Sequence, residues 1–137
     1  MLALASLSLA ARAQLLKPAQ VPAAAVAAFK AKFPAVKTNT WEKEGDKYEA
    51  GFKMNGNTMS ALITPAGALV ETETDMPPAK LPAPVRAALA RDYKAYQVTE
   101  AATLMSADGK TTYEAEVSKG GKHQDVVFNA DGSLARK

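Results

Sequence analysis

The sequence predicts an α+β fold of two tandem units, each a helix followed by a four-stranded antiparallel meander, with the helices packed on one face of the sheet. The first observation behind this prediction is that Tyr-Glu-Ala occurs at 48–50 and again at 113–115. The second is that residues 21–34 match residues 81–94 at an offset of 60, which becomes 65 after a five-residue insertion near 106–110. A period of this length is too long for a solenoid repeat.

Each unit is expected to open with a helix, because its apolar residues recur at i, i+4 and i+8 and so form one stripe. The stripes consist of Ala25, Phe29 and Phe33 in the first unit and Val85, Leu89 and Tyr93 in the second. Pro22 and Pro82 fall in the first turns, where a missing N–H is harmless. Pro34 is expected to end the first helix.

Alternating segments separated by turn signals predict the strands of the first unit at 38–44, 47–54, 57–64 and 68–73. Asn55-Gly56 is a strong two-residue hairpin signal, and Gly120-Gly121 takes its place in the second unit. Pairing around these turns assigns the residues that face the helices. They are Trp41, Tyr48, Ala50, Phe52, Met59, Ala61 and Ile63, then Tyr113, Ala115, Val117, Val126, Phe128 and Leu134.

The opposite face of the sheet is expected to be wet or to bind a partner, because it mixes charged, polar and a few apolar side chains. The candidate partner-binding residues are Glu49, Lys53, Ser60, Leu62, Glu114, Glu116, His123, Asp125 and Val127.

The start of the chain resembles the end of a secretory signal peptide, since an apolar run leads to Ala11-Arg12-Ala13. We therefore expect residues 1–13 to be a signal peptide with a truncated basic region, and the protein to be exported to the periplasm or the extracellular space. The other expected segments are a short N-terminal segment (14–19), a first repeat (20–74), a Pro-rich connector (75–80) and a second repeat (81–137).

The first unit carries a recognisable set of motifs, which the second repeats in part. A helix opened by Val-Pro, the run Trp-Glu-Lys-Glu-Gly-Asp-Lys-Tyr-Glu-Ala-x-Phe, an Asn-Gly turn and Gly-x-Leu resemble the PepSY-like and β-lactamase-inhibitor-like proteins exported by bacteria. The resemblance covers about residues 20–137. It implies a non-enzymatic protein that binds a peptidase or another envelope protein. The inhibitor proteins engage their target with an aromatic-rich sheet face, whereas the outward face predicted here has no aromatic residue.

Composition excludes several kinds of chemistry. The 137 residues contain no Cys, so disulfides, thiol catalysis and Cys-based zinc sites are excluded, and the net charge of +3 comes from interspersed charges without the basic stripe of a nucleic-acid binder. His123 is the single histidine; a weak metal site with Glu116 and Asp125 is one interpretation, and a solvated strand residue is the favoured one. The carboxylate pairs Glu71/Glu73 and Glu114/Glu116 are expected to be solvated, because a thin sheet offers no desolvated cleft.

The sequence therefore predicts a protein that is not an enzyme, needs no cofactor or metal, and binds a protein or peptide without contacting nucleic acid or spanning a membrane. The alternative is a structural or envelope-associated protein that acts by self-association or by pairing of a sheet edge. A small hydrolase is a third, disfavoured interpretation, because no set of catalytic groups converges in the sequence.

Overall fold

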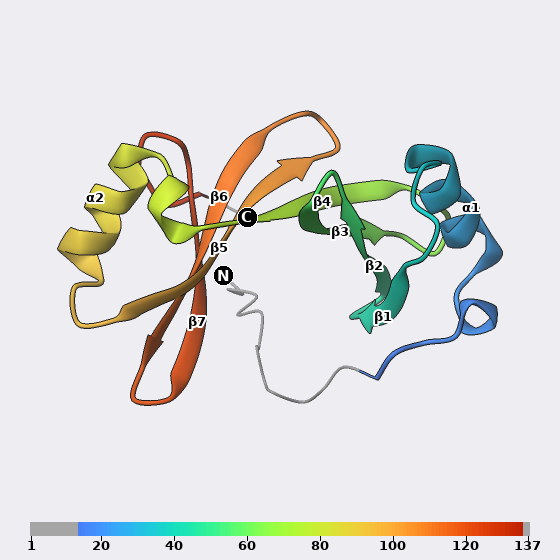
Figure 1. Cartoon of the computed structure of the whole chain (residues 1–137), viewed down its shortest axis with the longest axis horizontal. Helices are drawn as coiled ribbons and strands as arrows, with labels where there is room; N and C mark the ends of the chain where they lie inside the picture. Colours follow the sequence, from blue (N-terminus) through green and yellow to red (C-terminus); the bar gives the residue numbers. More distant parts are fainter. Residues whose placement is uncertain (1–13, 136–137) are drawn as a thin grey trace. The chain divides into compact units, whose positions relative to one another are not determined.

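The computed structural model describes residues 14–135, in which two α-helices and seven strands are found (Figure 1). The predicted signal peptide (1–13) lies outside the described residues. The helices are η1 (Pro18–Gln20), α1 (Ala23–Lys32), η2 (Pro78–Lys80) and α2 (Ala83–Asp92), where η marks a one-turn 3₁₀ helix. The strands are β1 (Thr40–Glu44), β2 (Lys47–Met54), β3 (Asn57–Ile63), β4 (Leu69–Met76), β5 (Gln97–Ser106), β6 (Thr111–Lys119) and β7 (Lys122–Phe128).

The chain divides into two compact units. The N-terminal unit holds the described residues up to Thr74 together with Met105–Gly109, and the C-terminal unit holds Asp75–Leu104 and the described residues from Lys110 onward. The helices of the two units match at a spacing of sixty residues, since α1 begins at Ala23 and α2 at Ala83. Within residues 14–135, no helix is long and apolar enough to cross a membrane.

The core of the N-terminal unit is a cluster of aromatic side chains between α1 and the strands. Phe29 of α1 is 2% exposed and lies with its ring centroid 5.6 Å from that of Trp41 and 5.2 Å from that of Phe52. Phe33 completes the cluster, with its ring 4.7 Å from that of Phe52. The prediction that Trp41 is a core residue is confirmed. Edge-to-face ring pairs of this kind add to the stabilisation that comes from burial alone.

The core of the C-terminal unit has fewer rings. Val85 and Leu89 of α2 pack on Ala115, Val117 and Phe128 of β6 and β7. Around this cluster lie the half-buried side chains of Met76, Tyr93, Tyr96, Val98 and Tyr113.

The prediction of two tandem helix-plus-four-strand units is wrong. The seven strands are hydrogen-bonded in chain order as one sheet, with β4 beside β5, and the second helix is followed by three strands. After Gly132 the described residues form only one isolated bridge, Phe128 with Leu134, and Leu134 is 62% exposed rather than facing the helix. The physical reason is that a strand at a sheet edge presents unpaired N–H and C=O groups, so two separate meanders would leave two more open edges than one continuous sheet.

The segments flanking the helices are more regular than expected. The first part of the predicted connector continues β4 as far as Met76, and η2 forms a single turn within it. The N-terminal segment also makes a strand-like contact, because the Leu16 N–H donates to the Trp41 carbonyl at 2.8 Å. This hydrogen bond covers part of the outer edge of β1.

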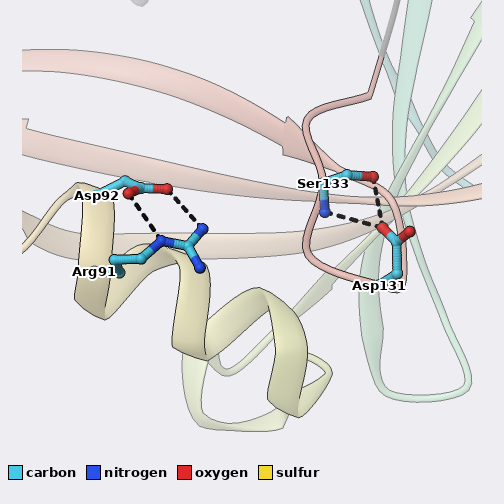
Figure 2. A network of polar contacts seen from close by, with 4 residues as sticks. All are labelled: Arg91, Asp92, Asp131 and Ser133. Atoms are coloured by element: carbon cyan, nitrogen blue, oxygen red, sulfur yellow. Dashed lines mark hydrogen bonds and ion pairs between the residues drawn. The ribbon is translucent and has the colours of Figure 1, made fainter.

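Two turns hold the sheet against the helices, and each needs a glycine. Gly67 and Gly132 have φ of +90° and +87°, a conformation that residues with a Cβ rarely adopt. A Cβ at Gly132 would lie 2.5 Å from the Pro84 carbonyl oxygen, and one at Gly67 would lie 2.7 Å from the Ala24 carbonyl oxygen. Asp131 closes the second turn by accepting hydrogen bonds from the Ser133 N–H at 2.9 Å and from its hydroxyl at 2.5 Å (Figure 2).

Candidate functional site

The hairpins set the register that places the candidate residues on the outward face. Around Asn55-Gly56, Tyr48 pairs with Ile63 and Phe52 with Met59, as predicted. Because side chains alternate across a strand, Glu49 and Lys53 of β2 point away from α1. In the C-terminal unit, Ala115 pairs with Val126 and Glu116 with Asp125, so the polar members of β6 and β7 also share the outward face.

Five glutamates gather on the outward face of β1–β4, and we call them the carboxylate face. Glu42 of β1 lies directly opposite Glu49 of β2, Glu49 lies opposite Leu62 of β3, and Leu62 lies opposite Glu71 of β4. In the neighbouring row, Ser60 pairs with Glu73. The full set is Glu42, Glu44, Glu49, Glu71 and Glu73, with Ser60 and Leu62 between them and with Lys47 and Lys53 at the two ends of β2.

Glu49 lies at the centre of the carboxylate face and holds its proton unusually tightly. Its pKa is raised from 4.5 to about 8, chiefly because the half-buried carboxyl is partly removed from water and also because it is hydrogen-bonded to Glu44 and repelled by the charges of Glu44, Glu73 and Glu42. At neutral pH Glu49 is therefore largely protonated. The expectation of solvated carboxylates was made for the pairs Glu71/Glu73 and Glu114/Glu116, and the raised pKa of Glu49 adds a carboxyl of a different kind.

The outward face of the C-terminal unit is organised differently. Glu116 of β6 accepts a hydrogen bond from the Thr99 hydroxyl of β5 at 2.6 Å, and its Oε1 lies 2.9 Å from Nδ1 of His123 on β7. These contacts lower the pKa of Glu116, with the Thr99 hydrogen bond as the largest cause. His123 is thus a partner of a carboxylate on an exposed strand, and no group of three metal-ligating side chains forms among residues 14–135.

The predicted site residues fall into two sets, because each compact unit carries its own outward face. Lys53 and His123 are exposed, while the other seven are half-buried. The N-terminal set is Glu49, Lys53, Ser60 and Leu62, and the C-terminal set is Glu114, Glu116, His123, Asp125 and Val127.

The sequence analysis missed Glu42 and Glu44 as members of the face, and it treated Glu71 and Glu73 only as a solvated pair. The signal that reveals them is the strand register. Once Trp41 is placed inward, Glu42 and Glu44 must point outward beside Glu49. Glu71 and Glu73 join them through the pairing of β3 with β4.

Comparison with solved structures identifies the fold. A β-lactamase-inhibitor-like protein from Bacteroides fragilis matches with a TM-score of 0.66 and 25% identity, covering 88% of this chain and 85% of its own. A DUF2874 family protein from Bacteroides uniformis matches with a TM-score of 0.73 and 22% identity, covering 85% of this chain and 87% of its own. The fold is β-lactamase-inhibitor-like. A candidate periplasmic protein from Bacteroides eggerthii shares it, with a TM-score of 0.73, 22% identity and coverage of 85% of this chain and 86% of its own.

These similarities support the β-lactamase-inhibitor-like part of the expected resemblance, while the PepSY-like part stays a prediction. No family model matches the sequence, and no curated protein matches it either. The function must therefore be argued from the residues of the site.

Proposed function

We propose that the protein is an exported, non-enzymatic binding module whose carboxylate face binds a cationic segment of a protein or peptide. The observation that carries the proposal is the opposition of Glu42 and Glu49 on neighbouring strands, within reach of the charges of Glu44 and Glu73. Like charges directly opposite each other destabilise a sheet, so ionisation of Glu49 opposite Glu42 is unfavourable in the free protein, and Glu49 keeps its proton. Lys or Arg side chains of a partner would favour the ionised form of Glu49 and pair with it.

The shape and polarity of the face suit such a partner. Leu62 lies between Glu49 and Glu71, and Ser60 lies opposite Glu73, so an apolar and a hydroxyl contact are available among the charges. Protein interfaces that are rich in charged and hydroxyl groups are polar and hydrated. Their affinity depends on a few strongly contributing side chains more than on the buried area. We expect binding that weakens as salt is added, because electrostatic attraction between partners is screened.

Similarity to solved proteins supports the same proposal. One neighbour is described as β-lactamase-inhibitor-like and another as a candidate periplasmic protein, which fits a protein that is exported and acts by binding. We further propose that this binding inhibits a peptidase or another envelope protein.

The test is calorimetry with an oligo-lysine peptide at pH 7 in buffers of different ionisation enthalpy. A cation close to Glu49 favours its ionised form, so binding should release protons, and the measured heat should depend on the buffer. Glu49→Gln should bind without that dependence, and Glu73→Gln should bind more weakly. Glu116→Gln, on the other unit, is the matched control and should behave as the wild type. Binding that is insensitive to salt and equal for all four proteins would refute the proposal.

Pairing through a sheet edge is the second candidate function. Its support is that β7 is an outer strand of the sheet, with Lys122, His123 and Gln124 exposed, while Val127 is covered by a hydrogen bond from the Ala135 N–H at 2.9 Å. Self-association of the purified protein, measured by analytical ultracentrifugation and removed by His123→Pro, would favour this alternative, because the His123 N–H points away from β6.

A further inference from the structure

An open groove of about 410 Å³ lies against α2 in the C-terminal unit, and neither the predicted binding residues nor the carboxylate face includes it. Its volume falls within the range of about 300–1,000 Å³ that is common for small-molecule sites. We call it the α2 groove. It is lined by Pro78, Leu81, Arg86, Leu89, Ala90, Tyr93, Lys94, Tyr96 and Val98.

The matched positions of the two units differ in the size of their apolar side chains. In the N-terminal unit, Phe29 and Trp41 lie sixty residues before Leu89 and Ala101, so two large ring side chains correspond to smaller aliphatic ones. Phe52 corresponds likewise to Val117 at the offset of 65. Of these smaller residues, Leu89 lines the α2 groove.

The charge of matched residues is a second difference between α1 and α2. Val26 of α1 packs on the aromatic cluster of its unit, and the matched residue of α2 is Arg86, at the groove. The Arg86 Nε donates to the Leu81 carbonyl at 3.0 Å, which fixes the side chain and leaves both terminal nitrogens of the guanidinium as donors. Lys94 is the other charged residue of the lining, which contains no carboxylate.

Two tyrosines give the groove a flat apolar wall with polar tips. The Tyr96 N–H donates to the Tyr93 carbonyl at 2.9 Å, which turns the chain directly after α2. The two rings then meet edge to face, with centroids 5.7 Å apart. Because a tyrosine ring is apolar and its hydroxyl can donate a hydrogen bond, this wall suits a ligand that is apolar along its body and an acceptor at one end.

We propose that the α2 groove binds a small apolar molecule that carries one carboxylate. The carboxylate would accept hydrogen bonds from Arg86, since a guanidinium matches the planar geometry of a carboxylate. Arg86 lies near the amino end of α2, where the helix dipole also favours an anion, whereas Lys94 follows its carboxyl end. The apolar body would lie along Leu89, Tyr93 and Val98.

Calorimetry with octanoate at pH 7.5 tests this proposal, with octanamide as the neutral ligand of matched length. We expect octanoate to bind with 1:1 stoichiometry and octanamide to bind at least tenfold more weakly. Arg86→Gln should weaken octanoate binding by roughly tenfold to a hundredfold, as loss of a charge-assisted hydrogen bond does. Ala90→Phe, a change at an exposed position of the lining, should block the groove without entering the core.

Arg91→Gln is the control, because Arg91 lies on the same helix outside the groove and pairs with Asp92 at 2.9 Å (Figure 2). It should bind octanoate as the wild type does, and so should Glu49→Gln on the other unit. A tripeptide of apolar residues with a free or an amidated carboxyl end distinguishes the source of the ligand. Tighter binding of the free peptide than of octanoate assigns the groove to a protein carboxyl terminus, and the reverse assigns it to a free acid. Equal binding of octanoate and octanamide, or no binding of either acid, would overturn the proposal.

Discussion

Replacing Glu49 by Gln should make the protein less sensitive to alkaline pH. The pKa of Glu49 is about 8 in the folded protein and about 4.5 for an unperturbed Glu, so the folded state binds more protons than the unfolded state between these two values. The stabilisation that protonated Glu49 contributes is therefore full below about pH 4.5 and is lost as the pH rises through about 8. An ion-paired carboxylate gives the opposite dependence of unfolding free energy on pH, because its protonation destabilises the fold.

The magnitude follows from the shift and from the exposure of the group. At about 1.4 kcal/mol per pKa unit, the shift from 4.5 to about 8 sets an upper limit of about 5 kcal/mol. Glu49 is only half-buried, so solvent and salt screen much of this energy. We expect a loss of about 1–2 kcal/mol between pH 5.5 and 9 in the wild type.

The assay is urea denaturation followed by circular dichroism at pH 5.5, 7 and 9. The wild type should lose stability across this series, and Glu49→Gln should lose about 1–2 kcal/mol less, since its amide does not ionise. Glu116→Gln is the control of equal size on the other unit, because the lowered pKa of Glu116 keeps that carboxylate ionised throughout the series. Parallel stability curves for the wild type and Glu49→Gln would refute the argument that Glu49 retains its proton in the fold.

Three further predictions concern the cores, a turn and the polar network. Phe29→Ala should cost about 3–5 kcal/mol of unfolding free energy and Leu89→Ala about 2–3 kcal/mol, because the first change removes the centre of the ring cluster; equal losses in urea denaturation would contradict this ranking. Gly132→Ala should cost about 2–3 kcal/mol, since its φ of +87° and the nearby Pro84 carbonyl leave no place for a Cβ; a melting temperature equal to that of the wild type would show that the turn adapts. Thr99→Ala should raise the pKa of Glu116, measured by NMR titration of its side-chain carbon, and an unchanged value would assign the shift to His123 instead.

The local elements could be predicted from the sequence because their signals are local. Asn55-Gly56 fixes the turn between β2 and β3, and alternation then places Tyr48, Phe52 and Ile63 on the side of the helix, as found. The apolar stripe of α1 and the stop at Pro34 are equally short-range signals. Each of these features depends on residues that are close in sequence.

The pairing of β4 with β5 could not be predicted in the same way, because a whole helix separates the two strands. The Ala107 N–H donates to the Val70 carbonyl at 3.0 Å, and the Thr103 hydroxyl lies 3.4 Å from the Met76 sulfur, yet no turn residue encodes these contacts. The acidic neighbours of Glu49 were missed for a related reason. Their charges come from β1 and β4, so the pKa of Glu49 depends on registers across three strand pairs.

The contrast between the two outward faces bears on which of them binds a partner. In the C-terminal unit, Thr99 donates to Glu116 and His123 lies at hydrogen-bond distance from the same oxygen, so the carboxylate is already stabilised by its neighbours. In the N-terminal unit, Glu49 is partly buried and lies beside the acidic Glu44, and both effects favour its protonated form. A cation from a partner would gain little by displacing the contacts of Glu116, whereas beside Glu49 it would favour the ionised carboxylate and pair with it. The same unit has the ring cluster around Phe29, whose burial offsets the cost of keeping such a face on a thin sheet. The acidic cluster around Glu49 and the ring cluster around Phe29 therefore occur in one unit, which is why we propose cationic partners for β1–β4 and a structural role for the Thr99–Glu116–His123 network.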